Sequence, residues 1–167
     1  MMYLWQVNRT LLAGALGIVA LVILLALYQY YAVAPNIPSQ KIKWYNKKGN
    51  LQTVNSTQHP KMIVFSASWC GNCRDELKSI NAQTNLDSSR VWVLSEESWN
   101  AIDKLKAIAP RLNYGKLATS LSQLKIHSIP SIYFFNSRSQ IIKKHTGNIR
   151  WEDYSNREHY FKLLQIQ

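Results

Sequence analysis

Hydrophobic and polar positions divide the chain into an apolar N-terminal segment and a longer mixed segment. From Thr10 to Gln40 no residue is charged, and residues 11–27 are apolar without interruption. Aromatic residues stand before and after this run, where amphipathic rings settle at the two bilayer interfaces. A helix needs about 20 apolar residues to cross a hydrocarbon core of about 30 Å. We therefore predict a short flank over residues 1–10 and one transmembrane anchor over residues 11–31.

The same segment has a second interpretation, a cleaved signal peptide. Ala32-Val33-Ala34 has the small-x-small form of a cleavage site. Against cleavage, the apolar run is longer than the usual ~7–15 residues of a signal peptide, and Pro35 would follow the cut. We favour a retained anchor.

The basic residues on the two sides of the predicted anchor do not decide on which side of the membrane the C-terminal domain lies. Lysines at 41, 43, 47 and 48 follow the apolar segment, whereas only Arg9 and the terminal amine precede it. Counted literally, the positive-inside rule puts the C-terminal domain in the cytoplasm. Whole domains, however, translocate largely regardless of charge, so this count does not decide the sidedness.

The longer segment begins with a linker and a hairpin. Pro35 and Pro38 favour an extended linker over residues 32–40, so the folded domain spans residues 41–167. Polar and apolar residues alternate on both sides of a turn-rich stretch, which predicts a β-hairpin over residues 41–54.

The rest of the domain has the pattern of strands separated by helices. Residues 62–65 form a short apolar run, typical of a buried central strand. The elements predicted after it are a helix from Cys70 to about Thr84, a strand over 91–94, a helix capped by Ser95 or Ser98 and stopped by Pro110, a helix over 116–124, strands over 131–135 and 140–145, and a last helix with the capping-box spacing Ser155 to Glu158. This order predicts an α/β fold with a central mixed sheet flanked by helices.

Composition narrows the class of protein. At 167 residues the chain has room for one compact domain, and 47% apolar with 17% charged residues excludes a disordered chain. The formal charge is +11, and every acidic residue lies at Asp75 or later. Such a basic balance attracts nucleic acid or anionic lipid, yet no nucleic-acid motif accompanies it. We therefore expect a solvated basic surface and no nucleic-acid partner.

Two cysteines carry the candidate chemistry. Cys70 and Cys73 stand three residues apart at the start of a predicted helix, which places both sulfurs on one side of its first turn. A cysteine at a helix N-terminus has a lowered thiol pKa, because unsatisfied backbone N–H groups favour the thiolate. Cys70 is therefore the candidate nucleophile, and Cys73 is the residue that resolves the mixed disulfide.

Three other interpretations of the pair stay open, namely a structural disulfide, two inert core thiols, or half of a metal site. A zinc site would need two further ligands, and His127 and His145 show no paired ligand spacing. A disulfide that closes so short a loop would contribute little stability. We expect neither a metal nor an organic cofactor.

The sequence around the cysteines resembles a known family. Residues 62–77, MIVFSASWCGNCRDEL, look like the strand, turn and active-site helix of thioredoxin-like proteins. The form Trp-Cys-x-x-Cys-Arg-x-Glu, the preceding hairpin and the N-terminal anchor are similar to the TlpA/ResA/DsbE branch. The resemblance covers about residues 41–166 and implies a thioredoxin-like fold. Residues 128–131, Ser-Ile-Pro-Ser, resemble the family's cis-proline loop, and Gly147 matches the glycine after its last strand.

The resemblance assigns supporting residues, each with an alternative. Ile129 and Pro130 would lie against Cys70 in a cis-proline loop, where an extended substrate strand pairs; otherwise Pro130 is an ordinary trans turn proline. Trp69 would shield the nucleophile, although a core tryptophan has the same sequence signature. Glu76 resembles an acid that influences the cysteine titration in ResA-like members, and its alternative is an exposed residue stabilised by the helix dipole.

Two sites in the sequence differ from relatives whose redox behaviour is known. Val64 stands where cytoplasmic thioredoxin has a buried aspartate that assists proton transfer, so any general base must be Glu76, water or the substrate. Gly71 and Asn72 between the cysteines are neither the Gly-Pro of thioredoxin nor the Pro-His of the oxidant DsbA. The direction of electron transfer therefore stays open.

Together these features lead us to expect a membrane-anchored thiol-disulfide oxidoreductase. The resemblance implies reduction or exchange of disulfides in envelope client proteins, for example in cytochrome c maturation. It also implies a membrane partner of thiol redox type, and a domain that faces the periplasm from a bacterial inner membrane. The alternative is a non-catalytic thioredoxin-fold binding module whose disulfide is structural.

Overall fold

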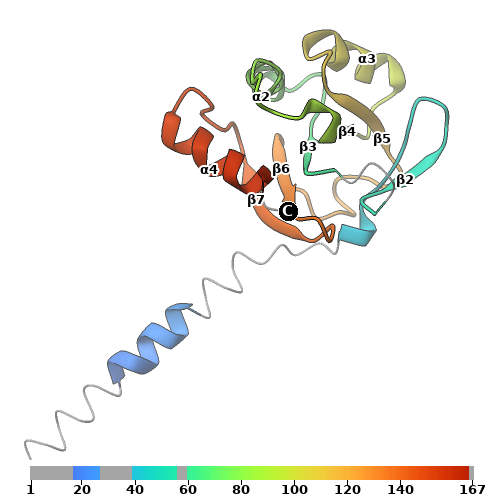
Figure 1. Ribbon diagram of the computed structural model, residues 1–167. Helices are drawn as coiled ribbons and strands as arrows, with labels where there is room; N and C mark the ends of the chain where they lie inside the picture. Colours follow the sequence, from blue (N-terminus) through green and yellow to red (C-terminus); the bar gives the residue numbers. More distant parts are fainter. Residues whose placement is uncertain (1–16, 27–38, 56–59, 166–167) are drawn as a thin grey trace, which may run out of the picture. The chain divides into compact units, whose positions relative to one another are not determined.

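The computed structural model divides the chain into two units, residues Met1–Ala34 and Pro35–Gln167. The residues that it describes are 17–26, 39–55 and 60–165. In the first unit the described residues are helical (Figure 1). Within the described ranges, no helix has both the length and the apolar character needed to span a bilayer.

Most of the predicted anchor and linker lie outside the described residues. The described helix covers only residues 17–26 of the anchor predicted over 11–31, and the linker predicted over 32–40 is described only at its end. Both therefore stay predictions.

A seven-stranded mixed sheet forms the centre of the second unit, in the order β2-β1-β5-β4-β3-β6-β7 (Figure 1). Strands β3, β4 and β5 run parallel to one another, and the other neighbours pair antiparallel. The strands are β1 (Lys43–Tyr45), β2 (Leu51–Thr53), β3 (Met62–Phe65), β4 (Val91–Ser95), β5 (Asn113–Leu117), β6 (Ser131–Phe135) and β7 (Ile141–Thr146). The predicted hairpin, central strand, and mixed sheet are confirmed.

Three α-helices accompany the sheet. They are α2 (Gly71–Asn81), α3 (Trp99–Ile108) and α4 (Tyr154–Gln165). Two short 3₁₀ helices, η1 (Ser39–Lys41) and η2 (Ser88–Arg90), precede β1 and β4. Figure 1 shows α4 beside β6 and β7, and α2 and α3 next to each other.

The two faces of the sheet are buried in two separate clusters. Along β3, Met62 and Val64 face one side and Ile63 and Phe65 face the other, as successive strand residues must. The helix-side cluster contains side chains of all three helices, among them Leu77, Ile80, Leu105 and Tyr160. The hairpin-side cluster contains, among others, Ile42, Trp44, Val54, Leu117 and Leu124. Burial on both faces explains why β3 is an uninterrupted apolar run.

The predicted helix over residues 116–124 is wrong. Its first residues belong to β5, which pairs with β4 on one side and β1 on the other. Gly115 lies in this strand, and a Cβ atom there would come within 2.9 Å of the Trp44 and Leu94 side chains. Residues 121–125 form turns. Strand pairing and this close approach decide the structure here, and neither is visible in local periodicity.

Helix ends also differ from the prediction. Helix α2 ends at Asn81 and does not reach Thr84. Ser98 occupies the cap position of α3, but its side chain makes no capping hydrogen bond. At α4 the capping side chain is Asp153, which accepts from the N–H of Ser155 at 3.0 Å and from its hydroxyl at 2.8 Å. The predicted capping box is therefore replaced by an acidic cap two residues earlier.

Candidate active site

The two cysteines form a disulfide at the start of α2. Their Cα atoms are 5.2 Å apart, which contradicts the interpretation as two separate core thiols. Cys70 is the N-cap residue of the helix, with extended backbone (φ −81°, ψ 111°), and its Sγ accepts a hydrogen bond from the N–H of Cys73 at 3.2 Å. The sulfur of Cys70 thus occupies the place that a serine or aspartate oxygen takes in an ordinary helix cap.

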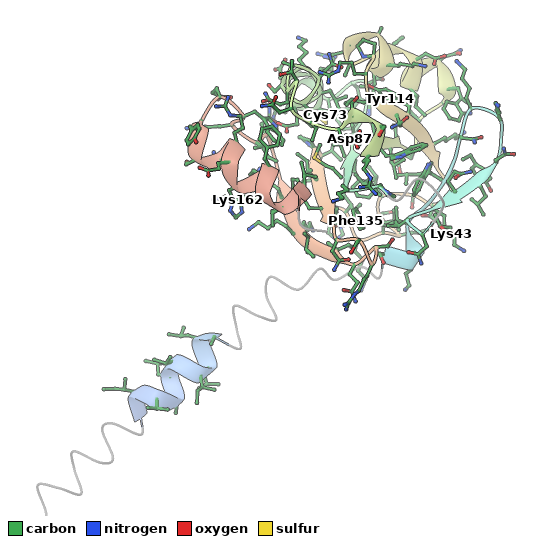
Figure 2. All side chains as sticks on the ribbon, viewed as in Figure 1. Lys43, Cys73, Asp87, Tyr114, Phe135 and Lys162 are labelled. Atoms are coloured by element: carbon green, nitrogen blue, oxygen red, sulfur yellow. A yellow bond between two sulfur atoms is a disulfide. The ribbon has the colours of Figure 1, made fainter. Side chains whose placement is uncertain are left out.

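Accessibility distinguishes the two cysteine residues. Cys70 retains 8% of its surface, whereas Cys73 is fully buried. Cys73 belongs to the first turn of α2, where Figure 2 labels it. An external reactant therefore reaches Cys70 before Cys73.

The turn before α2 begins where β3 ends. Ser66 continues the pairing with β4 by donating its N–H to the Leu94 carbonyl at 3.0 Å. Cys70 then donates its N–H to the Ala67 carbonyl at 3.2 Å, which closes a tight turn. Cys70 therefore lies at the edge of the sheet where the carboxyl ends of β3 and β4 meet.

The predicted proline loop lies against Cys70. The Ile129–Pro130 peptide bond is cis, so the alternative of an ordinary trans proline is wrong. The Ile129 carbonyl oxygen is 3.8 Å from Cys70 Sγ, and the Ile129 side chain packs on the cysteine pair. Pro130 accepts from the N–H of Gly147 at 2.8 Å, and Gly147 has a φ of +88°, a conformation that favours glycine.

Glu76 is completely buried, so the alternative of an exposed first-turn residue is wrong. Its Oε1 accepts from the indole Nε1–H of Trp151 at 2.7 Å, and its Oε2 accepts from the backbone N–H of Ile149 at 2.9 Å. Burial raises the pKa of Glu76 to about 7, and the two hydrogen bonds oppose that rise. Glu76 follows Cys73 by three residues in α2, on the same face of the helix.

The partners of Glu76 were not among the predicted site residues. Ile149 and Trp151 belong to the segment between β7 and α4, and they reach Glu76 across 73 and 75 positions of the chain. Both are buried in the helix-side cluster. The sequence signal for them is two apolar residues at spacing two within an otherwise polar stretch.

Comparisons with known proteins now identify the family. A family model described as a thioredoxin-like domain matches residues 48–162. The chain belongs to the thioredoxin-like domain family. No curated protein matches it.

Solved structures have the same fold as this thioredoxin-like domain at low sequence identity. A thio-disulfide isomerase from Thermus thermophilus is 18% identical, with a TM-score of 0.60, over 81% of this chain and 97% of that one. A putative thiol:disulfide interchange protein DsbE from Chlorobium tepidum is 14% identical, with a TM-score of 0.62, over 78% and 99%. The thioredoxin domain of a Bacteroides vulgatus thiol-disulfide oxidoreductase is 19% identical, with a TM-score of 0.55, over 77% and 96%.

The remaining predicted site residues of the thioredoxin-like domain are also placed. Trp69 has 73% of its surface exposed next to Cys70, so the alternative of a core tryptophan is wrong. Val64 is buried in the helix-side cluster, the same cluster that holds the two partners of Glu76. The one buried carboxyl group on this side of the described sheet thus comes from α2, and none comes from β3.

The two histidines weighed as zinc ligands do not join the cysteines. His127 is exposed, and His145 Nδ1 lies 2.9 Å from the hydroxyl of Tyr160. Within the described ranges, no group of three or more His, Cys, Asp and Glu side chains could hold a metal ion.

Proposed function

We propose that this protein is a thiol-disulfide oxidoreductase, with Cys70 as nucleophile and Cys73 as resolving cysteine. One observation carries the proposal. Cys70 retains 8% of its surface and caps α2 with its sulfur, and it is bonded to a fully buried cysteine whose helix face also carries a buried carboxyl group. A disulfide that only stabilised the fold would need neither the residual exposure of Cys70 nor the buried acid.

The first step of the proposed reaction forms a mixed disulfide. In the reduced protein the Cys70 thiolate attacks one sulfur of a client disulfide; a new S–S bond forms, the client S–S bond breaks, and one client thiolate leaves. The N–H of Cys73, which points at Cys70 Sγ, stabilises the attacking thiolate by a charge-assisted hydrogen bond. The Ile129 carbonyl, beside the same sulfur, offers the client backbone a strand-like partner.

The second step needs a proton acceptor in the interior. Cys73 is buried, so its thiol must lose a proton before it attacks Cys70 Sγ and releases the second client thiolate. Glu76 is the nearby candidate, since a carboxyl group with a pKa of about 7 exchanges protons readily at neutral pH. The cycle ends with the Cys70–Cys73 disulfide and a client reduced by two electrons.

The N-terminal segment and the disulfide chemistry together support a cellular location for the proposed reaction. An uncharged segment from Thr10 to Gln40 supports a single membrane anchor. Disulfide chemistry favours the periplasmic side of a bacterial inner membrane for the domain. On that oxidising side a reductant needs a membrane partner of thiol redox type to regenerate its dithiol. Envelope proteins with disulfides are then the clients, and apocytochromes before haem attachment are one such class.

Trapping of the mixed disulfide tests the activity. In detergent-solubilised full-length protein, Cys73→Ser should accumulate a covalent complex with a disulfide-bonded client peptide, because nothing resolves it; Cys70→Ser should accumulate none. Absence of the complex with Cys73→Ser, and equal alkylation of both thiols in the reduced wild type, would instead support a binding module. A reduction potential of about −270 mV would identify a reductant, and one of about −120 mV an oxidant.

A further inference from the structure

The turn between β3 and α2 is held by charged side chains from two other segments. Ser68 donates its backbone N–H to Oε2 of Glu97 at 2.5 Å and its hydroxyl to Oε1 of Glu97 at 2.8 Å. Arg74, in the first turns of α2, donates from Nη1 to the Ser68 carbonyl oxygen at 3.1 Å. We call Glu97, Ser68 and Arg74 the Ser68 clamp. All the polar groups of Ser68 are engaged in it.

The sheet topology brings Glu97 to this position. Because β3 and β4 are parallel neighbours, the residues that follow them meet at the same edge of the sheet. Glu97 comes two residues after the end of β4, and Ser95 at that end donates its hydroxyl to Oε2 of Glu97 at 3.3 Å. Three donors therefore converge on one half-buried carboxylate. Such a set of contacts holds the carboxylate in a single side-chain geometry.

The clamp compensates for weak packing next to the nucleophile. Trp69 lies between Ser68 and Cys70 and has 73% of its surface exposed, so burial of this ring does not hold the turn in place. While the disulfide is intact, the bond to Cys73 fixes Cys70 Sγ. Once the disulfide opens, that constraint is lost, and the backbone on the N-terminal side of Cys70 is held by the turn hydrogen bond to Ala67 and by the contacts of Ser68.

We infer that Glu97 is a positioning residue, which acts through Ser68 to keep Cys70 Sγ over the first turn of α2 in the dithiol form. The inference rests on the proposed function. A sulfur held there keeps its hydrogen bond from the N–H of Cys73, and this bond favours the thiolate that attacks the client. Glu97 touches neither the sulfur nor the client in this role.

Four variants distinguish an effect of Glu97 on the position of Cys70 from an effect of its negative charge. Glu97→Ala removes both acceptors and the charge. Glu97→Gln removes the charge, but its amide oxygen can accept from the Ser68 N–H while its amide nitrogen donates to the Ser68 hydroxyl. Ser68→Ala removes only the hydroxyl donor. Glu96→Ala is the matched control, because it removes an equal charge from the neighbouring residue, whose carboxylate accepts from Leu121 N–H at 2.9 Å.

The measurement is the pH profile of iodoacetamide alkylation of Cys70 in reduced full-length protein, with the plateau rate at high pH as internal reference. We expect Glu97→Ala to raise the apparent pKa of Cys70 by about 0.5–1, so that the rate at pH 7 falls about three- to tenfold while the plateau stays unchanged. Ser68→Ala should give a smaller shift. Glu97→Gln and Glu96→Ala should keep the wild-type profile.

Two outcomes would overturn the inference. If Glu97→Ala and Glu97→Gln both lower the apparent pKa, Glu97 acts by its negative charge. If the profile is unchanged and only the thermal stability of the oxidised variants falls, Glu97 is structural. Both outcomes presuppose selective alkylation of Cys70 in the wild type. Loss of that selectivity in the wild type is the separate result that counts against the oxidoreductase itself.

Discussion

At the scale of the residue, Glu76 combines three properties that rarely occur together. It is fully buried, it has a partner on each carboxylate oxygen, and its pKa is raised to about 7. The hydrogen bonds from Trp151 and Ile149 stabilise the ionised form, yet the loss of hydration outweighs them. Glu76 can therefore be charged or neutral near neutral pH while its position is held by the same two donors.

This raised pKa makes folding stability depend on pH. The native state holds the proton more tightly than the unfolded chain, whose glutamate has a pKa of about 4.5. Stability from this group is fully present below that value and falls as the pH rises toward 7, by up to about 3 kcal/mol. Urea unfolding of the oxidised protein at pH 5 and pH 8 measures the difference.

The variant Glu76→Gln isolates this effect from other groups. Its amide does not titrate, so its free energy of unfolding should fall less between pH 5 and pH 8 than that of the wild type. Glu158→Gln is the matched control, because Glu158 is exposed in α4 and should keep the wild-type dependence. An identical pH dependence in wild type and Glu76→Gln would show that Glu76 has an ordinary pKa.

At the scale of the element, β5 shows how packing selects a residue type. Gly115 lies where β5 passes between the Trp44 and Leu94 side chains, in the middle of the hairpin-side cluster. The absence of a side chain lets β5 pair with β4 and β1 at once. The hairpin β1–β2 is joined to the rest of the sheet only through this strand, so Gly115 is central to that connection.

Substitution of this glycine should therefore destabilise the domain. In Gly115→Ala the new Cβ would clash with the Trp44 ring and would lie 2.9 Å from the Leu94 side chain, and such overpacking costs about 1–3 kcal/mol of unfolding free energy. Gly71→Ala is the control, because its Cβ would meet nothing closer than 4.0 Å. Urea unfolding of both variants checks this; equal stability of Gly115→Ala and wild type would contradict it.

At the scale of the whole molecule, the chain combines a redox domain with an uncharged N-terminal segment. The domain carries most of the 20 basic residues, and four lysines follow directly on that segment within residues 41–48. Lysine on this flank favours the cytoplasmic side, whereas disulfide chemistry favours the oxidising side. We expect the chemistry to be the better guide, because lysines that belong to a folded domain have little influence on its translocation.

Reporter fusions test this orientation in the cell. An alkaline phosphatase joined after Gln40 should be active, since this enzyme needs the oxidising periplasm to form its disulfides. A reporter that works only in the cytoplasm, joined at the same residue, is the matched control and should be inactive. The reverse pattern would place the domain in the cytoplasm and would contradict the proposed envelope clients.

The sequence alone predicted the features that depend on residues close together in the chain. Alternation predicted the hairpin, an apolar run predicted β3, and the resemblance over residues 62–77 and 128–131 pointed to the cysteine pair and to Pro130. Each of these features depends on neighbours in the chain or on a short motif. Tertiary structure alone decided the strand at Gly115, the burial of Glu76, and the clamp that joins Ser68 to Glu97. These depend on contacts between segments distant in the chain, and periodicity within one segment carries no information about its partners.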